Sequence, residues 1–209
     1  ATGDMMSFGT MFAVLLTFYF QSKGINFGFL PTALLTLPFA IIMMILYMLL
    51  IDKFVFSYYR IKKSPPVQLA MVSVGVMFVT QAIIRIIIGP YDRRFLDGEK
   101  FILKANEFKE MTGLNEGLAI KSTQLITIII TIIVVSLMFW FLNKTKTGTS
   151  MRAYSDNEDL ALLSGIDPKR VVLLTWVIAG VLATVGGVLY GLDKSYKPFV
   201  YFNNMLSIF

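Results

Sequence analysis

Long apolar runs separated by short polar segments dominate this chain. We expect membrane-spanning helices at residues 5–20, 29–51, 67–89, 121–142 and 171–192. Four of these runs reach the roughly 20 residues that a helix needs to cross a bilayer, whereas the first is short and is expected to be incomplete, tilted or broken. Each run should be helical, because the bilayer core offers no water to unpaired backbone groups. The pattern therefore predicts an all-α, polytopic transmembrane helical bundle with about five spans.

Basic residues gather in two of the polar segments. Lysine and arginine outnumber acids in segments 52–66 and 143–170, whereas segment 90–120 is balanced, with five basic and six acidic residues. The positive-inside rule places the two basic segments in the cytoplasm and segment 90–120 in the periplasm. The same rule accounts for the net charge of +6. We therefore expect contact with membrane lipid and no nucleic-acid partner.

The polar stretch 151–170 predicts a short helix between two spans. SDNE at residues 155–158 fits a capping box, with Ser155 at the N-cap and Glu158 three positions later. Leu160, Ala161 and Leu163 form an apolar face, and Gly165 suits the left-handed position that follows a helix. Asp167 and Pro168 then start the next helix.

Two roles are open for this helix. It could rest on the lipid surface, as interfacial amphipathic helices do. Four carboxylates (Asp156, Glu158, Asp159 and Asp167) argue against that role, because cytoplasmic leaflets are negatively charged. A short helix with one apolar face is also suited to a groove on a partner protein.

Further features lie inside the spans. Ala179, Ala183, Gly187 and Gly191 recur every four residues and predict close helix packing, with a backbone-lined substrate path as the alternative. Arg85 is either a functional intramembrane charge or a side chain that snorkels to the interface. Pro38 is expected to kink the second span.

The chain offers few groups for catalysis. It contains no histidine and no cysteine, and it has no P-loop, nucleophile-elbow or zinc-protease motif. The predicted membrane cores hold no carboxylate. We therefore expect no catalytic residues, no metal, no cofactor, and a transport subunit rather than an enzyme.

Residues 147–191 (TGTSMRAYSDNEDLALLSGIDPKRVVLLTWVIAGVLATVGGVLYG) resemble the permeases of bacterial high-affinity branched-chain amino acid ABC transporters. The matching elements are Gly148, Arg152-Ala153, Gly165-Ile166 and the run Gly187-Val188-Leu189. Residues 1–17 and 58–81 also resemble this family, with matches at Gly3, Asp4, Gly9 and Arg60. Thr2 stands where the family usually has histidine. The resemblance implies a partial transmembrane permease domain over residues 1–209, with one N-terminal and several C-terminal helices missing.

The resemblance also implies a role for the polar helix. In ABC importers a cytoplasmic loop of each permease docks into a separate ATPase, often through an EAAxxxG pattern. Residues 159–165 are a degenerate version, in which Asp159 stands for glutamate, Leu160 for the first alanine, and Ala161 and Gly165 match. The residues expected to couple the chain to the ATPase are Gly148, Arg152, Ala153, Asp159, Ala161 and Gly165.

The resulting hypothesis is a permease subunit of an ATP-driven importer in the bacterial inner membrane. Its expected partners are ABC ATPase subunits, a second permease and a periplasmic substrate-binding protein. Branched-chain amino acids or related small polar solutes are the expected substrates, and urea or short-chain amides are the alternative. A membrane scaffold that recruits a cytoplasmic partner is the alternative of another class, and a membrane-embedded enzyme is disfavoured. No substrate-binding residues are identified.

Overall fold

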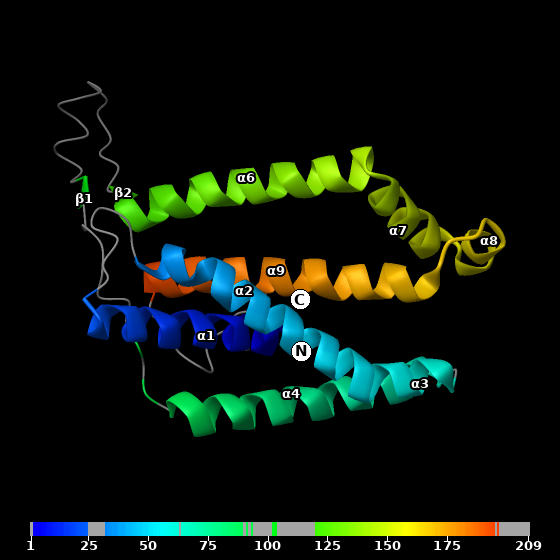
Figure 1. The fold of residues 1–209 in the computed structure, drawn as a ribbon, viewed down its shortest axis with the longest axis horizontal. Helices are drawn as coiled ribbons and strands as arrows, with labels where there is room; N and C mark the ends of the chain where they lie inside the picture. The colour runs from blue at the N-terminus through cyan, green and yellow to red at the C-terminus, as the bar shows by residue number, and fades with distance from the viewer. Residues whose placement is uncertain are drawn as a thin grey trace. The chain divides into compact units, whose positions relative to one another are not determined.

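Five helices in the described part of the chain are long and apolar enough to cross a membrane. The computed structural model describes residues 2–24, 32–62, 64–89, 91, 93, 102–103, 120–194 and 196. The five helices are α1 (Thr2–Ser22), α2 (Thr32–Ile51), α4 (Pro66–Ile88), α6 (Ser122–Lys144) and α9 (Pro168–Lys194), labelled in Figure 1. The predicted all-α bundle with about five spans is confirmed.

Several helix boundaries differ from the expected ones. Helix α1 is not a short or broken span, because it runs for 21 residues and includes Asp4 in its first turn. Helix α2 continues through Pro38. The expected loop at 52–66 is largely helical, with a π-helical segment (Asp52–Phe56) leading into α3 (Ser57–Ile61). Predicted segment 90–120 lies mostly outside the described residues; there, β1 (Ile102–Leu103) pairs antiparallel with β2 (Ile120–Lys121).

The chain forms two compact units. One comprises Ala1–Asp97 with Leu173–Phe209, and the other comprises Gly98–Val172. The first unit therefore holds α1, α2, α4 and most of α9, and the second holds α6, α7 (Lys146–Asp156), α8 (Glu158–Leu163) and the first residues of α9.

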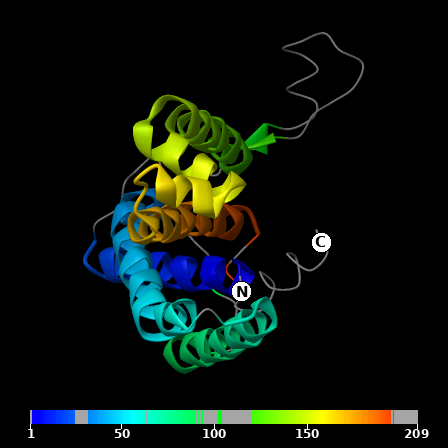
Figure 2. The ribbon, with the colours of Figure 1, turned by 90° about the vertical axis from the view of Figure 1, so that its right-hand side faces the viewer.

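Helix α1 is the central helix of the first unit. Figures 1 and 2 both show it flanked by α9 on one side and α4 on the other. Its buried apolar side chains pack with side chains of α2, α4 and α9. In the larger of two buried clusters, α1 and α2 contribute Met5, Phe8, Met11, Val14, Met44, Met48 and Ile51. The side chains of α1 therefore determine how this unit packs.

Small residues allow α1 and α9 to approach closely. A Cβ atom added to Gly9 would lie 2.6 Å from Thr184 Oγ1, and one added to Gly187 would lie 2.7 Å from the carbonyl oxygen of Met6. Real Cβ contacts are not this short, so both positions require glycine. The backbones of the two helices are thus in near contact, as small-residue membrane interfaces permit.

The expected packing stripe on α9 is partly misplaced. Ala183, Gly187 and Gly191 are buried, but Ala179 is exposed, and Gly180 packs 3.4 Å from Met48 Sδ. A strict four-residue spacing drifts around a helix that has 3.6 residues per turn. Alternating steps of four and three remain on one face, which explains why Gly180 lies on the contact face and Ala179 does not.

Candidate functional site

The first candidate site is the corner that α7 and α8 form in the second unit. Thr145 joins α6 to α7, and its hydroxyl forms hydrogen bonds with the backbone of both helices. Its hydroxyl donates to the carbonyl oxygen of Phe141 at 2.7 Å, and it accepts a hydrogen bond from Gly148 N at 3.0 Å. This N-cap satisfies a backbone group that the first turn of a helix leaves unpaired. The bend between the two helices is therefore defined by a single residue.

Gly148 is buried at this corner. A Cβ atom there would lie 2.6 Å from Leu142 Cα and would also meet the carbonyl oxygen of Phe141. Arg152 is exposed and donates from Nη1 to Asn143 Oδ1 at 3.0 Å, across the same corner. Both residues were expected to couple the chain to an ATPase, and both hold the first turns of α7 against the end of α6.

Asn157 separates α7 from α8. It is the C-cap of α7 and the N-cap of α8, and its side chain accepts from Leu160 N at 3.0 Å. The predicted capping box is therefore wrong, because Ser155 lies inside α7. Glu158 does not fold back as a capping-box residue; its carboxylate accepts from the Tyr154 hydroxyl at 2.5 Å.

The end of α8 follows the expected pattern. Gly165 has φ +80°, and its N–H donates to the carbonyl oxygen of Leu162. Ile166 N donates to the carbonyl oxygen of Ala161, which completes a Schellman motif. Asp167 Oδ1 then accepts from Lys169 N at 2.9 Å and caps α9. All four residues between α8 and α9, including Ser164, thus take part in defined hydrogen bonds.

Helix α8 exposes an apolar edge beside its acids. Leu160 is 61% exposed and Leu163 is 85% exposed, whereas Ala161 is buried. Asp159, in the first turn, is exposed, as is Ala153 on α7. The expected apolar face is therefore split, with its alanine facing inward and its leucines outward. The six residues expected to contact the ATPase all lie in α7, α8 and the turn that follows.

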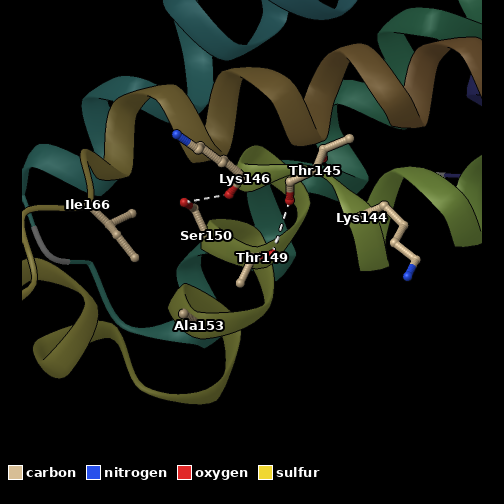
Figure 3. Close-up of a pocket in the computed structure, with 7 residues that line it drawn as sticks. All are labelled: Lys144, Thr145, Lys146, Thr149, Ser150, Ala153 and Ile166. Carbon is tan, nitrogen blue, oxygen red and sulfur yellow. Dashed lines mark hydrogen bonds between the residues drawn. The ribbon is translucent and has the colours of Figure 1, made fainter.

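A shallow hollow of about 330 Å³ lies on this corner (Figure 3). The Thr149 hydroxyl donates a hydrogen bond to the carbonyl oxygen of Thr145 at 3.0 Å, and the Ser150 hydroxyl donates one to the carbonyl oxygen of Lys146 at 2.9 Å. The remaining lining side chains include Lys144 and Lys146, which point in different directions in Figure 3. The hollow offers no convergent set of donors for a small ligand.

The second candidate site is a polar stripe inside the first unit. Asp4, Ser7, Thr10 and Thr17 are all buried, although all four lie on the apolar helix α1. The hydroxyls of Thr10 and Thr17 each donate a hydrogen bond of 2.7 Å to the backbone carbonyl oxygen one turn earlier in the same helix. Such local bonds satisfy a hydroxyl without a partner helix.

Asp4 corrects the expectation that the membrane cores hold no carboxylate. It lies within the candidate span Gly3–Ser22, is 2% exposed, and accepts from Gln81 Nε2 at 2.7 Å. Its second oxygen, Oδ2, is buried and has no hydrogen-bond partner among the described residues. The missed signal was the spacing of polar residues at positions 4, 7 and 10, which places them on one side of a helix.

Tyr196, which follows α9, bonds both to Arg93 and to Ser7 of the polar stripe. Its backbone pairs with Arg93 through hydrogen bonds of 2.9 and 2.7 Å, and its hydroxyl donates to the carbonyl oxygen of Ser7 at 3.2 Å. Burial raises the pKa of the Tyr196 hydroxyl to about 12. Arg85, by contrast, is exposed on α4, one turn beyond Gln81.

Comparison with known proteins gives one whole-chain match and several partial ones. Residues 1–209 match the family described as "Branched-chain amino acid transport system / permease component". The chain is 39% identical over 80 residues to the nucleoside ABC transporter permease protein NupB of Lactococcus lactis subsp. cremoris, covering 38% of this chain and 22% of that protein.

Two further relatives are named for branched-chain amino acids. A probable LivH permease of Methanocaldococcus jannaschii is 36% identical over 61 residues, 29% of this chain and 19% of the relative. The high-affinity LivH permease of Escherichia coli is 31% identical over 90 residues, 41% of this chain and 29% of the relative. The aligned segments thus span less than a third of each relative. No solved structure gives a significant match. Because the family match extends over the whole chain, this multi-pass membrane protein belongs to the branched-chain amino acid transport system permease components of the ABC transporter family.

Proposed function

We propose that this chain is a permease subunit of an ATP-driven importer in the bacterial inner membrane. Family membership supports the transport role, and the names of the LivH relatives support branched-chain amino acids or related small polar solutes as the cargo. In this proposal the ATPase activity resides in separate subunits. A second permease completes the pathway, and a periplasmic binding protein delivers the substrate.

The exposed leucine edge of α8 carries the proposed coupling to the ATPase. Leu160 and Leu163 lie three residues apart, on one side of a helix that has hydrogen-bonded caps at both ends. Burying two leucines would contribute roughly 1.5–3 kcal/mol each to docking. The acids Glu158 and Asp159 disfavour contact with a negative lipid surface. A groove on a partner protein therefore fits this edge better than lipid does.

The corner between α6 and α7 supports the same proposal. Gly148 allows the two helices to touch, and the Arg152–Asn143 hydrogen bond ties them together. A docking element that transmits movement has to be stiff, because a flexible joint would absorb the displacement. In our proposal the α7–α8 corner is the element that carries the motion of the ATPase to the spans.

The test is ATP-coupled uptake by a complex reconstituted from the permease and its co-purified partners. Leu163→Asn is expected to reduce uptake and ATPase co-purification about tenfold or more, since it removes the most exposed docking leucine. Ile61→Asn is the matched control, because Ile61 is similarly exposed at 81% and lies outside α7 and α8. Gly165→Pro and Arg152→Glu should also impair uptake. Unchanged uptake in all three α7–α8 variants would refute the coupling role.

The alternative substrates, and the alternative role as a scaffold, each predict a different result in uptake and co-purification experiments. The NupB relative favours nucleosides as a second candidate cargo, and urea or short-chain amides are the third. Competition of labelled leucine by each compound in the uptake assay separates these three classes. Co-purification with a single partner that is not an ATPase would instead indicate a scaffold.

A further inference from the structure

Asp4 is the one buried carboxylate among the described side chains of the spans. It is 2% exposed, and only one of its two oxygens is hydrogen-bonded, to the neutral amide of Gln81. Oδ2 has no partner in the part of the chain that the structure describes. An ionised carboxylate accepts hydrogen bonds at both oxygens. Asp4 therefore retains an unused acceptor inside the protein.

The depth of Asp4 follows from its partner. Gln81 belongs to α4, and at 1.5 Å per residue it lies about 10 Å from the Ile88 end and about 22 Å from the Pro66 end. The hydrocarbon core of a bilayer is about 30 Å thick. A group bonded to Gln81 is therefore well inside the core, where charged side chains are costly and mark functional sites.

No ion pair joins the carboxylate of Asp4 to a cation among the described residues. The ion pairs found there join Arg60 to Asp52, Arg170 to Asp167, and Lys194 to Asp193.

The chemistry of Oδ2 selects the kind of group that would complete the site. Protonation would remove the charge but would leave a buried O–H donor without an acceptor. A metal ion would need several oxygen or nitrogen ligands, and the described residues contain no group of three metal-ligating side chains. A primary ammonium group both cancels the charge and donates N–H hydrogen bonds to the free oxygen.

We propose that Asp4, positioned by Gln81, binds the ammonium group of a zwitterionic amino-acid substrate as it crosses the membrane. This inference rests on the proposed transport function and narrows its substrate class to solutes that carry an ammonium group. Because Asp4 is closed off from solvent, the structure corresponds to a state in which the site is covered. The substrate reaches the carboxylate when α1 and α4 separate on one side of Gln81.

Asp4→Asn is the decisive variant. Asparagine has the same shape and keeps a carbonyl oxygen for Gln81, but it removes the charge. The variant is introduced into the complex of permease, ATPase and binding protein, and uptake of radiolabelled leucine into proteoliposomes is measured. We expect leucine uptake to fall about tenfold or more, as loss of a charge-assisted hydrogen bond predicts. Assembly of the complex is expected to be unchanged.

Two control variants test the assignment. Asp193→Asn removes the other described carboxylate with an unpaired buried oxygen, and it should leave uptake unchanged. Asp4→Glu keeps the charge and should restore most of the uptake lost in Asp4→Asn. Equal losses in Asp4→Glu and Asp4→Asn, or failure of Asp4→Asn to assemble, would assign Asp4 a structural role and overturn the proposal.

The outcomes separate this inference from the proposed function. If Asp4→Asn takes up leucine as fast as the wild type, the inference is overturned and the transport function remains intact. A wild-type complex that transports nucleosides or urea but no amino acid would overturn both the amino-acid cargo and the inference. Uptake that requires sodium, and loses that requirement in Asp4→Asn, would assign the carboxylate to a metal ion instead.

Discussion

The side-chain oxygen of Asn157 lies 3.0 Å from the backbone nitrogen of Leu160 and forms the N-terminal cap of α8. The same residue ends α7. One asparagine therefore determines where one helix stops and where the next begins. The exposed leucines of α8 depend on this cap for their orientation.

Asn157→Ala is expected to destabilise α8 by about 1 kcal/mol, since an N-cap residue typically contributes that much. Hydrogen exchange of the Leu160 amide should speed up about fivefold, and exchange in α4 should not change. Ser155→Ala is the control, because Ser155 occupies the position that the sequence pattern favours for the cap but lies inside α7. Faster Leu160 exchange in Ser155→Ala than in Asn157→Ala would contradict this assignment.

Gly187→Ala is expected to lower the stability of the detergent-solubilised protein by about 1–3 kcal/mol, as overpacking does in a close-packed interior. The added methyl group would collide with Met6 and Thr10 on α1. Thermal melting followed by tryptophan fluorescence would measure the loss. The matched change Gly75→Ala, in α4, meets nothing within 4 Å and should be neutral or stabilising. Equal melting temperatures for the two variants would argue against the α1–α9 contact.

The Asp52–Arg60 ion pair bridges the π-helical segment. One guanidinium nitrogen of Arg60 contacts both carboxylate oxygens, at 2.7 and 2.8 Å. Because both side chains are partly exposed, a double-mutant cycle with Asp52→Asn and Arg60→Gln should give a coupling energy of only about 0.2–1 kcal/mol. Arg60→Lys should retain part of it, since a single nitrogen makes both contacts. The more exposed 3.5 Å pair of Arg170 and Asp167 serves for comparison, and Arg170→Gln should have no measurable effect.

Tyr196 predicts a loss of stability at high pH. Burial raises the pKa of its hydroxyl to about 12, above the usual value of about 10. The neutral phenol therefore stabilises the folded protein fully below pH 10, and this contribution is lost as the pH rises from about 10 to about 12. Tyr196→Phe should flatten the decline in melting temperature over that range, whereas Tyr91→Phe, at a position 74% exposed, should not. An identical decline in both variants would refute this account.

The spans and the end of α8 could be predicted from the sequence because their causes are local. An uncharged run of bilayer length has to be helical in lipid, and Gly165 adopts a positive φ at little cost. The Asp167-Pro168 pair likewise starts α9 with the residue types that favour a helix start. None of these features depends on a partner that is distant in the sequence.

The errors arose where a distant partner or a neighbouring helix decides the outcome. Ser155 and Asn157 are both good caps, and the choice between them depends on how far α7 extends before α8 begins. The first predicted span begins at residue 5 and leaves Asp4 outside, because hydropathy treats a charge as a boundary. The burial of Asp4 depends on Gln81, on another helix. Ala179 was assigned to the packing face by a regular spacing that the helical twist does not preserve.

The glycines of α1 and α9 also have a mechanical consequence. Where Gly9 faces Thr184 and Gly187 faces Met6, no layer of flexible side chains separates the two backbones. Close-packed contacts of this kind transmit strain instead of absorbing it. A displacement of α9 along its axis would therefore be transmitted to α1 at these two points. Asp4 lies on α1 and its partner Gln81 lies on α4, so such a displacement would act on the hydrogen bond that joins them.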